Sequence, residues 1–275
     1  MENSGKILVL IAVVAGLVMF NSCNKNEVEN ENVLSQTTVK DYLSLFISFE
    51  LAAEEEITSG DEDALKSAEV WDCLTVTVHE NETGEFWPRS WTLDYGPENC
   101  ETVWGNSRRG KIHVTLTDWW RNEGSLREIT FEDYYFNDNK LEGVKTILNT
   151  GENDEGNLTF TKKIKDGKLV YADGGEISWE CEKFSEQIEG NETLRFADDV
   201  WSVTGSGSGK NLDGFDYTFE ITTPLIYQSG CFYPVSGVIE ISTQESVQVI
   251  DYGNGECDNL ATTTTDDGDP ETIEL

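Results

Sequence analysis

The chain is poor in basic residues and in histidine, and each shortage excludes some functions. Its 275 residues contain 19 Lys and Arg against 53 Asp and Glu, for a net charge of −34. Binding to nucleic acid or to an anionic lipid surface requires positive side chains near phosphate, so this balance argues against both. With only His79 and His113 present, a histidine-rich zinc site is impossible. A Ser-His-Asp triad would have little choice of base.

Two common site motifs are also missing, although residues 204–210 resemble them superficially. This run reads Thr-Gly-Ser-Gly-Ser-Gly-Lys. A phosphate-binding loop requires glycine where Thr204 stands and Ser or Thr where Asn211 stands. The serine-hydrolase pattern G-x-S-x-G has Gly207 at the position of its serine. We therefore predict a flexible hairpin loop or a glycine-rich strand here.

The long hydrophobic run at residues 7–20 follows Lys6 and precedes Cys23. It is too short for a comfortable membrane span and has the length of the apolar region of a secretory signal. The end of the run, Phe20-Asn21-Ser22-Cys23, resembles a bacterial lipobox. This resemblance implies that residues 1–22 are removed and that Cys23 is lipidated, so the expected partner is a membrane, reached through the lipid anchor.

Residues 23–36 are polar and without periodicity, which predicts a disordered tether between the lipid and the folded part. Lys25, Glu27 and Glu29 resemble the acidic surface-export signal found after the lipidated cysteine in Bacteroidota lipoproteins. We therefore expect an outer-membrane lipoprotein exposed at the cell surface. Anchoring at the periplasmic face is the alternative.

One helix is predicted, at residues 37–57. Val39, Tyr42, Leu43 and Phe46 follow the i, i+3, i+4, i+7 pattern of an amphipathic helix. Thr38 can cap its N-terminus, and Asp41 can interact favourably with the helix dipole. A single helix cannot bury its apolar stripe alone, so we expect it to pack on the rest of the protein. Residues 58–69 are expected to form a polar linker.

Residues 70–275 are predicted to form one antiparallel β domain. The period of the apolar residues changes to two after Trp71, for example in residues 74–78, 111–117, 215–221 and 246–250. Glycine-containing turns separate such segments about every ten residues, and no helical stretches intervene. The fold class is therefore mainly β, an antiparallel meander with one short helix. The sheet is expected to be either open and barrel-like or split into a two-layer sandwich.

Four of the six cysteines belong to an internal repeat. In each copy, two predicted strands lie between two cysteines, and the second strand ends in Asp-Tyr-Gly, with three residues between this glycine and the second cysteine. Because the ends of an antiparallel hairpin lie opposite each other, we predict the disulfides Cys73–Cys100 and Cys231–Cys257. Cys181 remains, on a predicted strand face with Ile177 and Trp179, and is expected to be a buried inert thiol.

The order of these features resembles a group of Bacteroidota lipoproteins of unassigned function. The resemblance spans nearly the whole chain and implies export and a β-sheet fold, but it implies no activity and no site residues. After the lipobox, the helix and the first cysteine unit, the matching segments are Arg109–Ile112, Asp133–Asn137, Glu142-Gly143, Asp198–Val200 and Asp251–Asn259.

Four oxygen-bearing side chains near the C-terminus could hold a calcium ion. Asp251, Asn254, Glu256 and Asp258 fall within eight residues beside a glycine turn, and Ca²⁺ prefers such oxygen ligands. The EF-hand pattern is absent, and ordinary Asx and glycine turn chemistry also accounts for these residues. Apart from calcium at this position, we expect no cofactor.

The tryptophans offer candidate contacts for a ligand. Trp119 and Trp120 are predicted to end a strand, where adjacent side chains point to opposite faces, so at least one should be exposed. Together with Trp104 they are our candidates for stacking against sugar rings. The alternative is that they fill the core.

The expected function is therefore that of a lipid-anchored envelope protein that binds or supports another molecule, without a catalytic site. Its partner would be a polysaccharide or another envelope protein. Two alternatives stay open, a carbohydrate hydrolase that uses carboxylates and a calcium-stabilised adhesion module. Asp198 and Asp199 cannot supply both carboxylates of a hydrolase, because neighbours on a strand face opposite ways.

Overall fold

The structure is a computed structural model that describes residues 38–50, 73–81, 83–101, 105–193, 196–265 and 268–275. The predicted signal segment, Cys23, the tether, the linker at residues 58–69 and Trp104 lie outside the described residues. Within these ranges one helix is found, at residues 38–50, inside the predicted range 37–57.

Fourteen strands follow the helix. The first seven are β1 (Thr75–His79), β2 (Arg89–Asp94), β3 (Cys100–Glu101), β4 (Ser107–Leu116), β5 (Leu126–Phe136), β6 (Asn139–Glu152) and β7 (Leu158–Val170). The others are β8 (Glu176–Glu189), β9 (Val200–Lys210), β10 (Asp216–Gln228), β11 (Ser236–Ser242), β12 (Val247–Asn254), β13 (Leu260–Thr265) and β14 (Glu271–Glu274). A short 3-10 helix, Phe196–Asp198, precedes β9.

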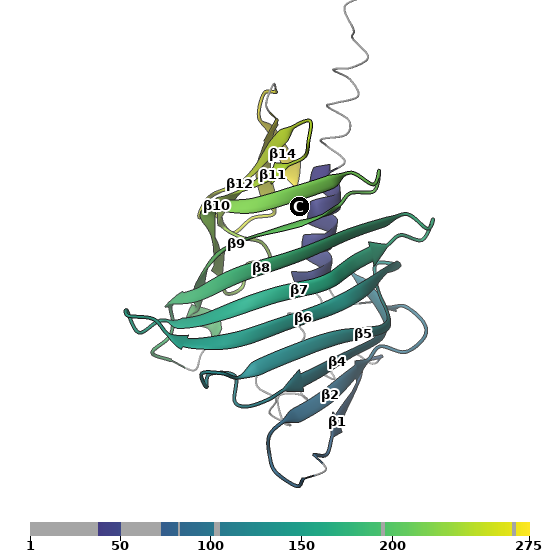
Figure 1. Ribbon diagram of the computed structural model, residues 1–275, viewed down its shortest axis with the longest axis vertical. Helices are drawn as coiled ribbons and strands as arrows, with labels where there is room; N and C mark the ends of the chain where they lie inside the picture. Colours follow the sequence, from purple (N-terminus) through teal and green to yellow (C-terminus); the bar gives the residue numbers. More distant parts are fainter. Residues whose placement is uncertain (1–37, 51–72, 82, 102–104, 194–195, 266–267) are drawn as a thin grey trace, which may run out of the picture.

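All fourteen strands belong to one antiparallel sheet in which neighbours along the chain are almost always neighbours in space. The order runs from β1 through β2 and β4 to β14, and only β3 lies off this path, paired with β4. The predicted antiparallel meander is therefore confirmed (Figure 1). It takes the form of a single open sheet, and β1 and β14 are its edges.

The helix packs on one face of this sheet, behind β7 to β10 in Figure 1. We call this the inner face; on β8 it carries Trp179 and Lys183, whereas Glu180 and Glu182 point to the opposite, outer face. Tyr42 of the helix lies with its ring centroid 4.9 Å from that of Phe219 on β10 and 5.8 Å from that of Trp179. These aromatic contacts bury the apolar stripe predicted from the sequence.

The start of the helix is joined to the turn between β9 and β10. Asn211 donates a hydrogen bond from Nδ2 to Oγ1 of Thr38, at 3.0 Å. The amide of Leu212 donates to Oδ2 of Asp41, at 2.6 Å. Thr38 and Asp41 were predicted from local helix chemistry alone, and the structure shows that both also fix the helix to the sheet.

The inner face also carries two buried lysines that meet the last described turn of the helix. Lys183 lies 3.1 Å and Lys145 lies 3.7 Å from carboxylate oxygens of Glu50, and both lysine side chains are 3% exposed. Lys145 donates a further hydrogen bond to the carbonyl of Phe49, at 3.2 Å. One helix carboxylate thus compensates two buried lysine charges.

The glycine-rich run is a regular strand. Residues 204–210 lie within β9, so of the two alternatives the glycine-rich strand is correct. Gly207 and Gly209 are on the inner face, directly opposite Phe219 and Tyr217 of β10. A Cβ atom on Gly207 would lie 2.5 Å from Cε1 of Phe219, and one on Gly209 would lie 2.8 Å from the Tyr217 hydroxyl. Glycine is needed here because the two aromatic side chains and the backbone carbonyls of β8 occupy the space that a Cβ atom would take.

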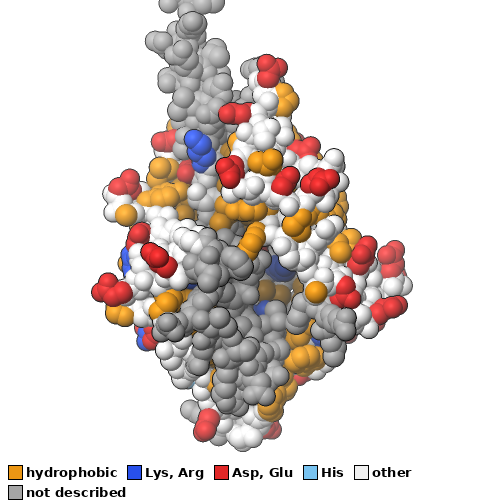
Figure 2. All heavy atoms as spheres, turned by 180° about the vertical axis from the view of Figure 1, so that it is seen from behind, with side chains coloured by type: hydrophobic (Ala, Val, Ile, Leu, Met, Phe, Trp, Pro, Cys, Tyr) orange, Lys and Arg blue, Asp and Glu red, His pale blue; other side chains and the backbone are white. Residues whose placement is uncertain are grey.

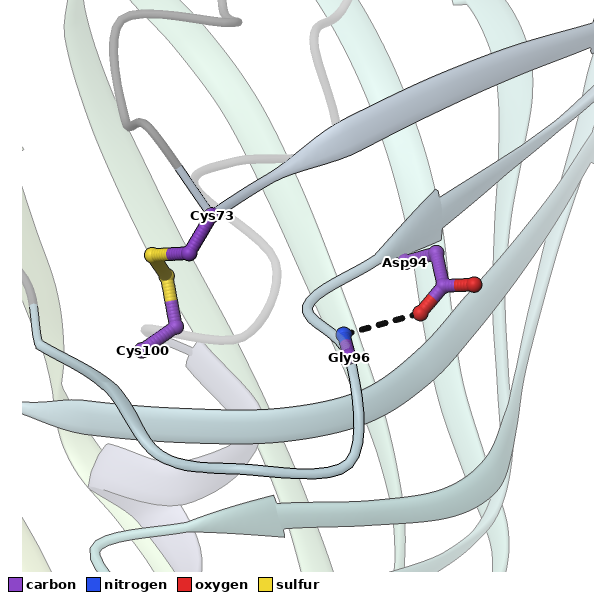
Figure 3. The surroundings of a disulfide bond; sticks show 4 residues. All are labelled: Cys73, Asp94, Gly96 and Cys100. Carbon is purple, nitrogen blue, oxygen red and sulfur yellow. Dashed lines mark hydrogen bonds between the residues drawn. A yellow bond between two sulfur atoms is a disulfide. The ribbon is translucent and has the colours of Figure 1, made fainter.

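Both predicted disulfides are present in the structure. The Cα atoms of Cys73 and Cys100 are 5.8 Å apart, and those of Cys231 and Cys257 are 5.6 Å apart. Figure 3 shows the first bond beside a turn in which the Gly96 amide donates to Oδ1 of Asp94, at 2.8 Å.

The second copy of the repeat has the same local structure. The Gly253 amide donates to Oδ1 of Asp251, at 2.9 Å. The tyrosines of the two Asp-Tyr-Gly motifs, Tyr95 and Tyr252, are 1% and 2% exposed. The repeat thus encodes one device twice: a buried tyrosine, an Asx turn and a disulfide that closes the hairpin.

Charge is distributed unevenly over the surface. In the view from behind, acidic side chains lie mainly around the rim, while hydrophobic side chains border the centre (Figure 2). No helix within the described ranges has the length and apolar character needed to cross a membrane.

Candidate functional site

A groove of about 960 Å³ crosses the outer face of the sheet. Its lining comes from six strands, β6 to β11, and from the turn after β11. The volume falls within the range of small-molecule sites, about 300–1,000 Å³. The groove opens to solvent along the sheet. It therefore suits an extended ligand that lies across the strands better than a small molecule that a pocket would surround.

Two rows of polar side chains line this groove, each formed by residues directly opposite one another on successive strands. The first row runs Glu142, Lys168, Ser178, Lys210 and Asp216. The second runs Glu180, Ser208, Thr218 and Ser242.

The cations of the first row are already compensated locally. Lys168 lies 3.3 Å from a carboxylate oxygen of Glu176, and Lys210 pairs with Asp216. The groove therefore presents mixed charges and hydroxyl groups rather than a single strong charge. It can donate and accept hydrogen bonds along its whole length.

The two tryptophans predicted as a platform lie together at a different place, in the connection between β4 and β5. Since β4 ends at Leu116, the prediction that Trp119 and Trp120 sit on a strand and face opposite ways is wrong. The chain turns here, with the Asn122 amide donating to the carbonyl of Trp119 at 2.8 Å. Both side chains are half-buried, and their ring centroids are 6.2 Å apart.

Trp120 is engaged in internal packing. Its ring stacks on that of Phe160 with centroids 6.0 Å apart, and the Arg121 guanidinium lies 5.1 Å from its centroid. Arg121 in turn donates to the backbone carbonyls of Asn191 and Thr193, at 3.1 and 3.2 Å. The Trp120 ring is thus held between Phe160 and Arg121, which leaves Trp119 as the better candidate for a surface contact.

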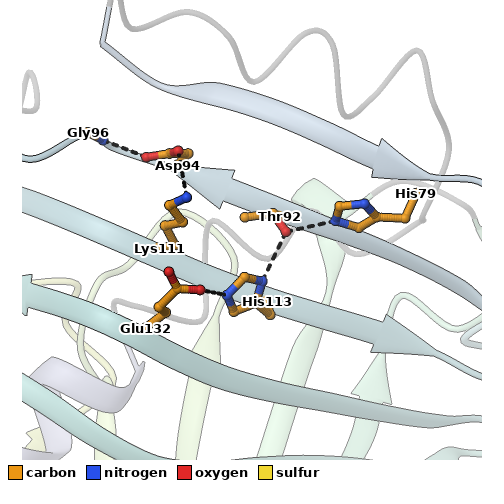
Figure 4. A network of polar contacts seen from close by, with 7 residues as sticks. All are labelled: His79, Thr92, Asp94, Gly96, Lys111, His113 and Glu132. Carbon is orange, nitrogen blue, oxygen red and sulfur yellow. Dashed lines mark hydrogen bonds and ion pairs between the residues drawn. The ribbon is translucent and has the colours of Figure 1, made fainter.

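Both histidines of the chain belong to one chain of hydrogen bonds on the outer face (Figure 4). Nε2 of His79 lies 2.8 Å from Oγ1 of Thr92, and the same oxygen lies 3.0 Å from Nδ1 of His113. Nε2 of His113 lies 2.8 Å from Oε2 of Glu132. The four residues come from β1, β2, β4 and β5, one from each adjacent strand.

The carboxylate sets the direction of this network. Because an ionised Glu132 only accepts, Nε2 of His113 donates to it, and in the neutral ring Nδ1 is then an acceptor. The Thr92 hydroxyl donates to that nitrogen and accepts from Nε2 of His79. The order hydroxyl, imidazole, carboxylate is that of acyl-transfer triads, but Thr92 is 8% exposed and its hydroxyl is covered by both rings, so it cannot reach a substrate.

The proposed calcium ligands are used for turns. Asp251 accepts from the Gly253 amide and Asp258 from the Leu260 amide, at 2.9 and 3.1 Å. All four side chains, including Asn254 and Glu256, are exposed. Among the described residues, no group of three or more His, Cys, Asp or Glu side chains is arranged to hold a metal ion.

The remaining carboxylate and thiol candidates are separated or buried. Asp198 is exposed and accepts from the Thr193 hydroxyl at 3.0 Å, whereas Asp199 is 5% exposed and accepts from Nε2 of Gln187 at 2.8 Å. Burial raises the pKa of Asp199, a shift that the Gln187 hydrogen bond opposes. Burial likewise raises the pKa of the free Cys181 thiol, which disfavours the reactive thiolate.

No protein-family model, curated protein sequence or solved structure matches this chain. The groove and the histidine network therefore stand on their geometry alone.

Proposed function

We propose that this protein is a lipid-anchored module of the cell envelope and that the outer-face groove binds a neutral polysaccharide. The observation that carries the proposal is the groove of about 960 Å³, lined by polar side chains from six neighbouring strands. A sheet held by its own hydrogen bonds provides a rigid surface, so the ligand need not order the protein on binding.

The spacing of the lining residues suits a chain of sugars. Neighbouring strands lie about 4.8 Å apart, so residues in one row repeat at that interval. This interval is close to the length of one pyranose unit. The hydroxyl groups of Ser208, Thr218 and Ser242, on three successive strands, can each meet a successive sugar.

The charge of the protein favours an uncharged ligand. At −34 the chain repels anionic polymers at long range. The two groove lysines do not reverse this, because each pairs with an acidic neighbour. A neutral polysaccharide avoids the repulsion and uses the hydrogen-bonding groups of both rows.

Export is supported by the cysteines. Disulfides persist in oxidising compartments and are rare in the cytosol, and the structure contains two, Cys73–Cys100 and Cys231–Cys257. This agrees with the lipobox-like segment before Cys23, which supplies the anchor in the proposal.

The anchor is tested on the amino terminus of the protein expressed in a bacterial host that carries out lipoprotein processing. We expect mass spectrometry to find Cys23 as the first residue, bearing fatty acids. Cys23→Ala should abolish lipid labelling and leave residues 1–22 attached, while the control Cys181→Ala is processed normally. An intact amino terminus without fatty acid on the wild-type chain would refute the anchoring.

The groove is tested by filling it. Ser208 is exposed at its centre, so Ser208→Trp should block the site without disturbing the core and weaken binding at least about tenfold. The control is Ser206→Trp, because Ser206 is also exposed on the outer face of β9 but does not line the groove. Affinity electrophoresis in gels containing galactomannan, xyloglucan, laminarin or pullulan measures retardation of each variant.

Each outcome supports or refutes the groove as the binding site. Retardation lost in Ser208→Trp and kept in Ser206→Trp supports the groove. If Trp119→Ala alone abolishes retardation and Ser208→Trp does not, the sugar binds at the tryptophans and the groove assignment is wrong. If none of the four polysaccharides retards the wild type, neutral polysaccharide binding is wrong.

A further inference from the structure

We infer that His79 and His113 form a binding site for one transition-metal ion, of the class Zn²⁺, Cu²⁺ or Ni²⁺, on the outer face at the β1 edge of the sheet. The starting observation is convergence. The chain has two histidines, and one nitrogen of each lies within 3.0 Å of a single oxygen, Oγ1 of Thr92.

The second ring nitrogen of His113 has the hydrogen-bond partner that is common for metal-binding histidines. A metal-ligating imidazole commonly donates its second N–H to a carboxylate, which fixes the tautomer and orients the ring. Glu132 plays this part, with Oε2 2.8 Å from Nε2 of His113. The hydrogen bond leaves Nδ1 without a proton, and its lone pair now accepts from the Thr92 hydroxyl, which is also bonded to His79.

The site is accessible and can adjust. His113 and Glu132 side chains are 39% and 58% exposed, and His79 is exposed on the edge strand β1. Metal–nitrogen distances of about 2.0–2.1 Å are shorter than the present contacts to the Thr92 oxygen. A bound ion would replace the hydrogen bonds of both nitrogens to Thr92. Rotation of the exposed His79 side chain would bring its Nε2 and the His113 Nδ1 onto one ion, and water would complete the coordination.

The ligand chemistry selects the metal. Imidazole nitrogen suits Zn, Cu and Ni, whereas Ca²⁺ and Mg²⁺ prefer oxygen ligands. The pair differs from the acidic groups elsewhere on this protein, which offer oxygen ligands alone. It also lies on different strands, β1 to β5, from the groove on β6 to β11, so it is independent of polysaccharide binding.

The test uses residues 23–275 with Cys23→Ala, so that neither a lipid nor a free thiol at position 23 complicates the titration. Isothermal titration should show one Cu²⁺ or Zn²⁺ ion bound per chain, and the electron paramagnetic resonance spectrum of the copper form should show two coupled nitrogens. His79→Asn or His113→Asn should lower the affinity at least about a hundredfold. Glu132→Gln, which only orients a ligand, should lower it about 10–100-fold.

Glu128→Gln is the matched control. Glu128 is exposed on the same face of β5, two residues before Thr130, which lies directly opposite His113 in the sheet. Its affinity should equal that of the wild type, and Ca²⁺ titrations should be the same for all variants. Absence of a stoichiometric site in the wild type would overturn the inference. So would unchanged binding in the His79→Asn/His113→Asn double variant, which would show that copper binds elsewhere.

Discussion

Glu50→Gln should lower the free energy of unfolding by about 3–5 kcal/mol, the usual cost of removing one partner from a buried ion pair. The glutamine keeps the size of the side chain but leaves the two lysines that contact it, Lys145 and Lys183, without its charge. Both lysine side chains are 3% exposed, although Glu50 itself is 26% exposed, so water can replace the carboxylate only in part. Urea denaturation at pH 7 measures the loss.

The same substitution at an exposed pair is the control. Glu182 lies 3.1 Å from Lys163, but these side chains are 48% and 54% exposed. Solvent screens such a pair, so Glu182→Gln should cost at most about 1 kcal/mol. Equal losses for Glu50→Gln and Glu182→Gln would contradict the special role of the buried lysines.

The effect of Glu50→Gln should depend on pH in a defined direction. Burial alone would raise the pKa of Glu50, but attraction to Lys145 and Lys183 outweighs burial and holds this pKa well below its ordinary range. A lowered pKa in the folded state stabilises the protein above the pKa of the unfolded chain, about 4.3, and the stabilisation fades as the pH falls below it. The difference between wild type and variant should therefore be smaller at pH 3 than at pH 7.

A rescue experiment separates stranded charge from lost packing. Lys145→Met and Lys183→Met added to Glu50→Gln remove all three charges and keep apolar chains beside Phe46 and Trp179, whose rings lie 4.6 and 5.2 Å from the Lys183 ammonium. Replacing a buried ion pair with apolar groups is often neutral or stabilising. If the triple variant stays as unstable as Glu50→Gln, the lysines are not the cause.

The strand order could be predicted because the relevant signals are local. Alternating segments with glycine turns imply an antiparallel meander, and neighbours along the chain pair with each other. The cysteine repeat worked for the same reason, since a hairpin places the two cysteines of each unit together. Both inferences need only residues that are close in sequence or joined by one turn.

The inner layer could not be predicted, because it depends on which helix face meets which strand. In the sequence, Lys145 and Lys183 look like ordinary polar positions. Their burial is explained only by their contact with Glu50, which lies far from both along the chain. The glycines of β9 are similar. Glycine is required at these positions because Phe219 and Tyr217 of the next strand pack there, and a glycine run alone cannot reveal what packs on it.

The two candidate surfaces depend on strand register, which explains why they could not be predicted from the sequence. His79, Thr92, His113 and Glu132 each stand at a polar position of a separate strand, and they meet only when four strands are aligned. The groove likewise combines residues of six strands. A shift of one residue in any strand would turn its contribution to the other face, so neither site has a linear motif.

The second large effect is expected from the disulfides. Each bond closes a loop of nearly equal length, with sequence separations of 27 and 26. The chain-entropy model assigns each a stabilisation of roughly 3–4 kcal/mol. Cys231→Ala/Cys257→Ala should lower the free energy of unfolding by about this amount, measured by urea denaturation without reductant.

Removing the first bond should cost more than removing the second, because the two pairs differ in burial although their loops match. Cys100 is 2% exposed and belongs to the hydrophobic core, whereas Cys257 is exposed. Cys73→Ala/Cys100→Ala therefore adds lost core packing to the entropy term. The control Cys181→Ala breaks no bond and reports the cost of removing a buried sulfur alone.

Equal stability of both disulfide variants and the wild type would show that the repeat does not stabilise the fold. A larger loss at Cys231–Cys257 would show that constraint of the β11–β12 hairpin outweighs burial at Cys100.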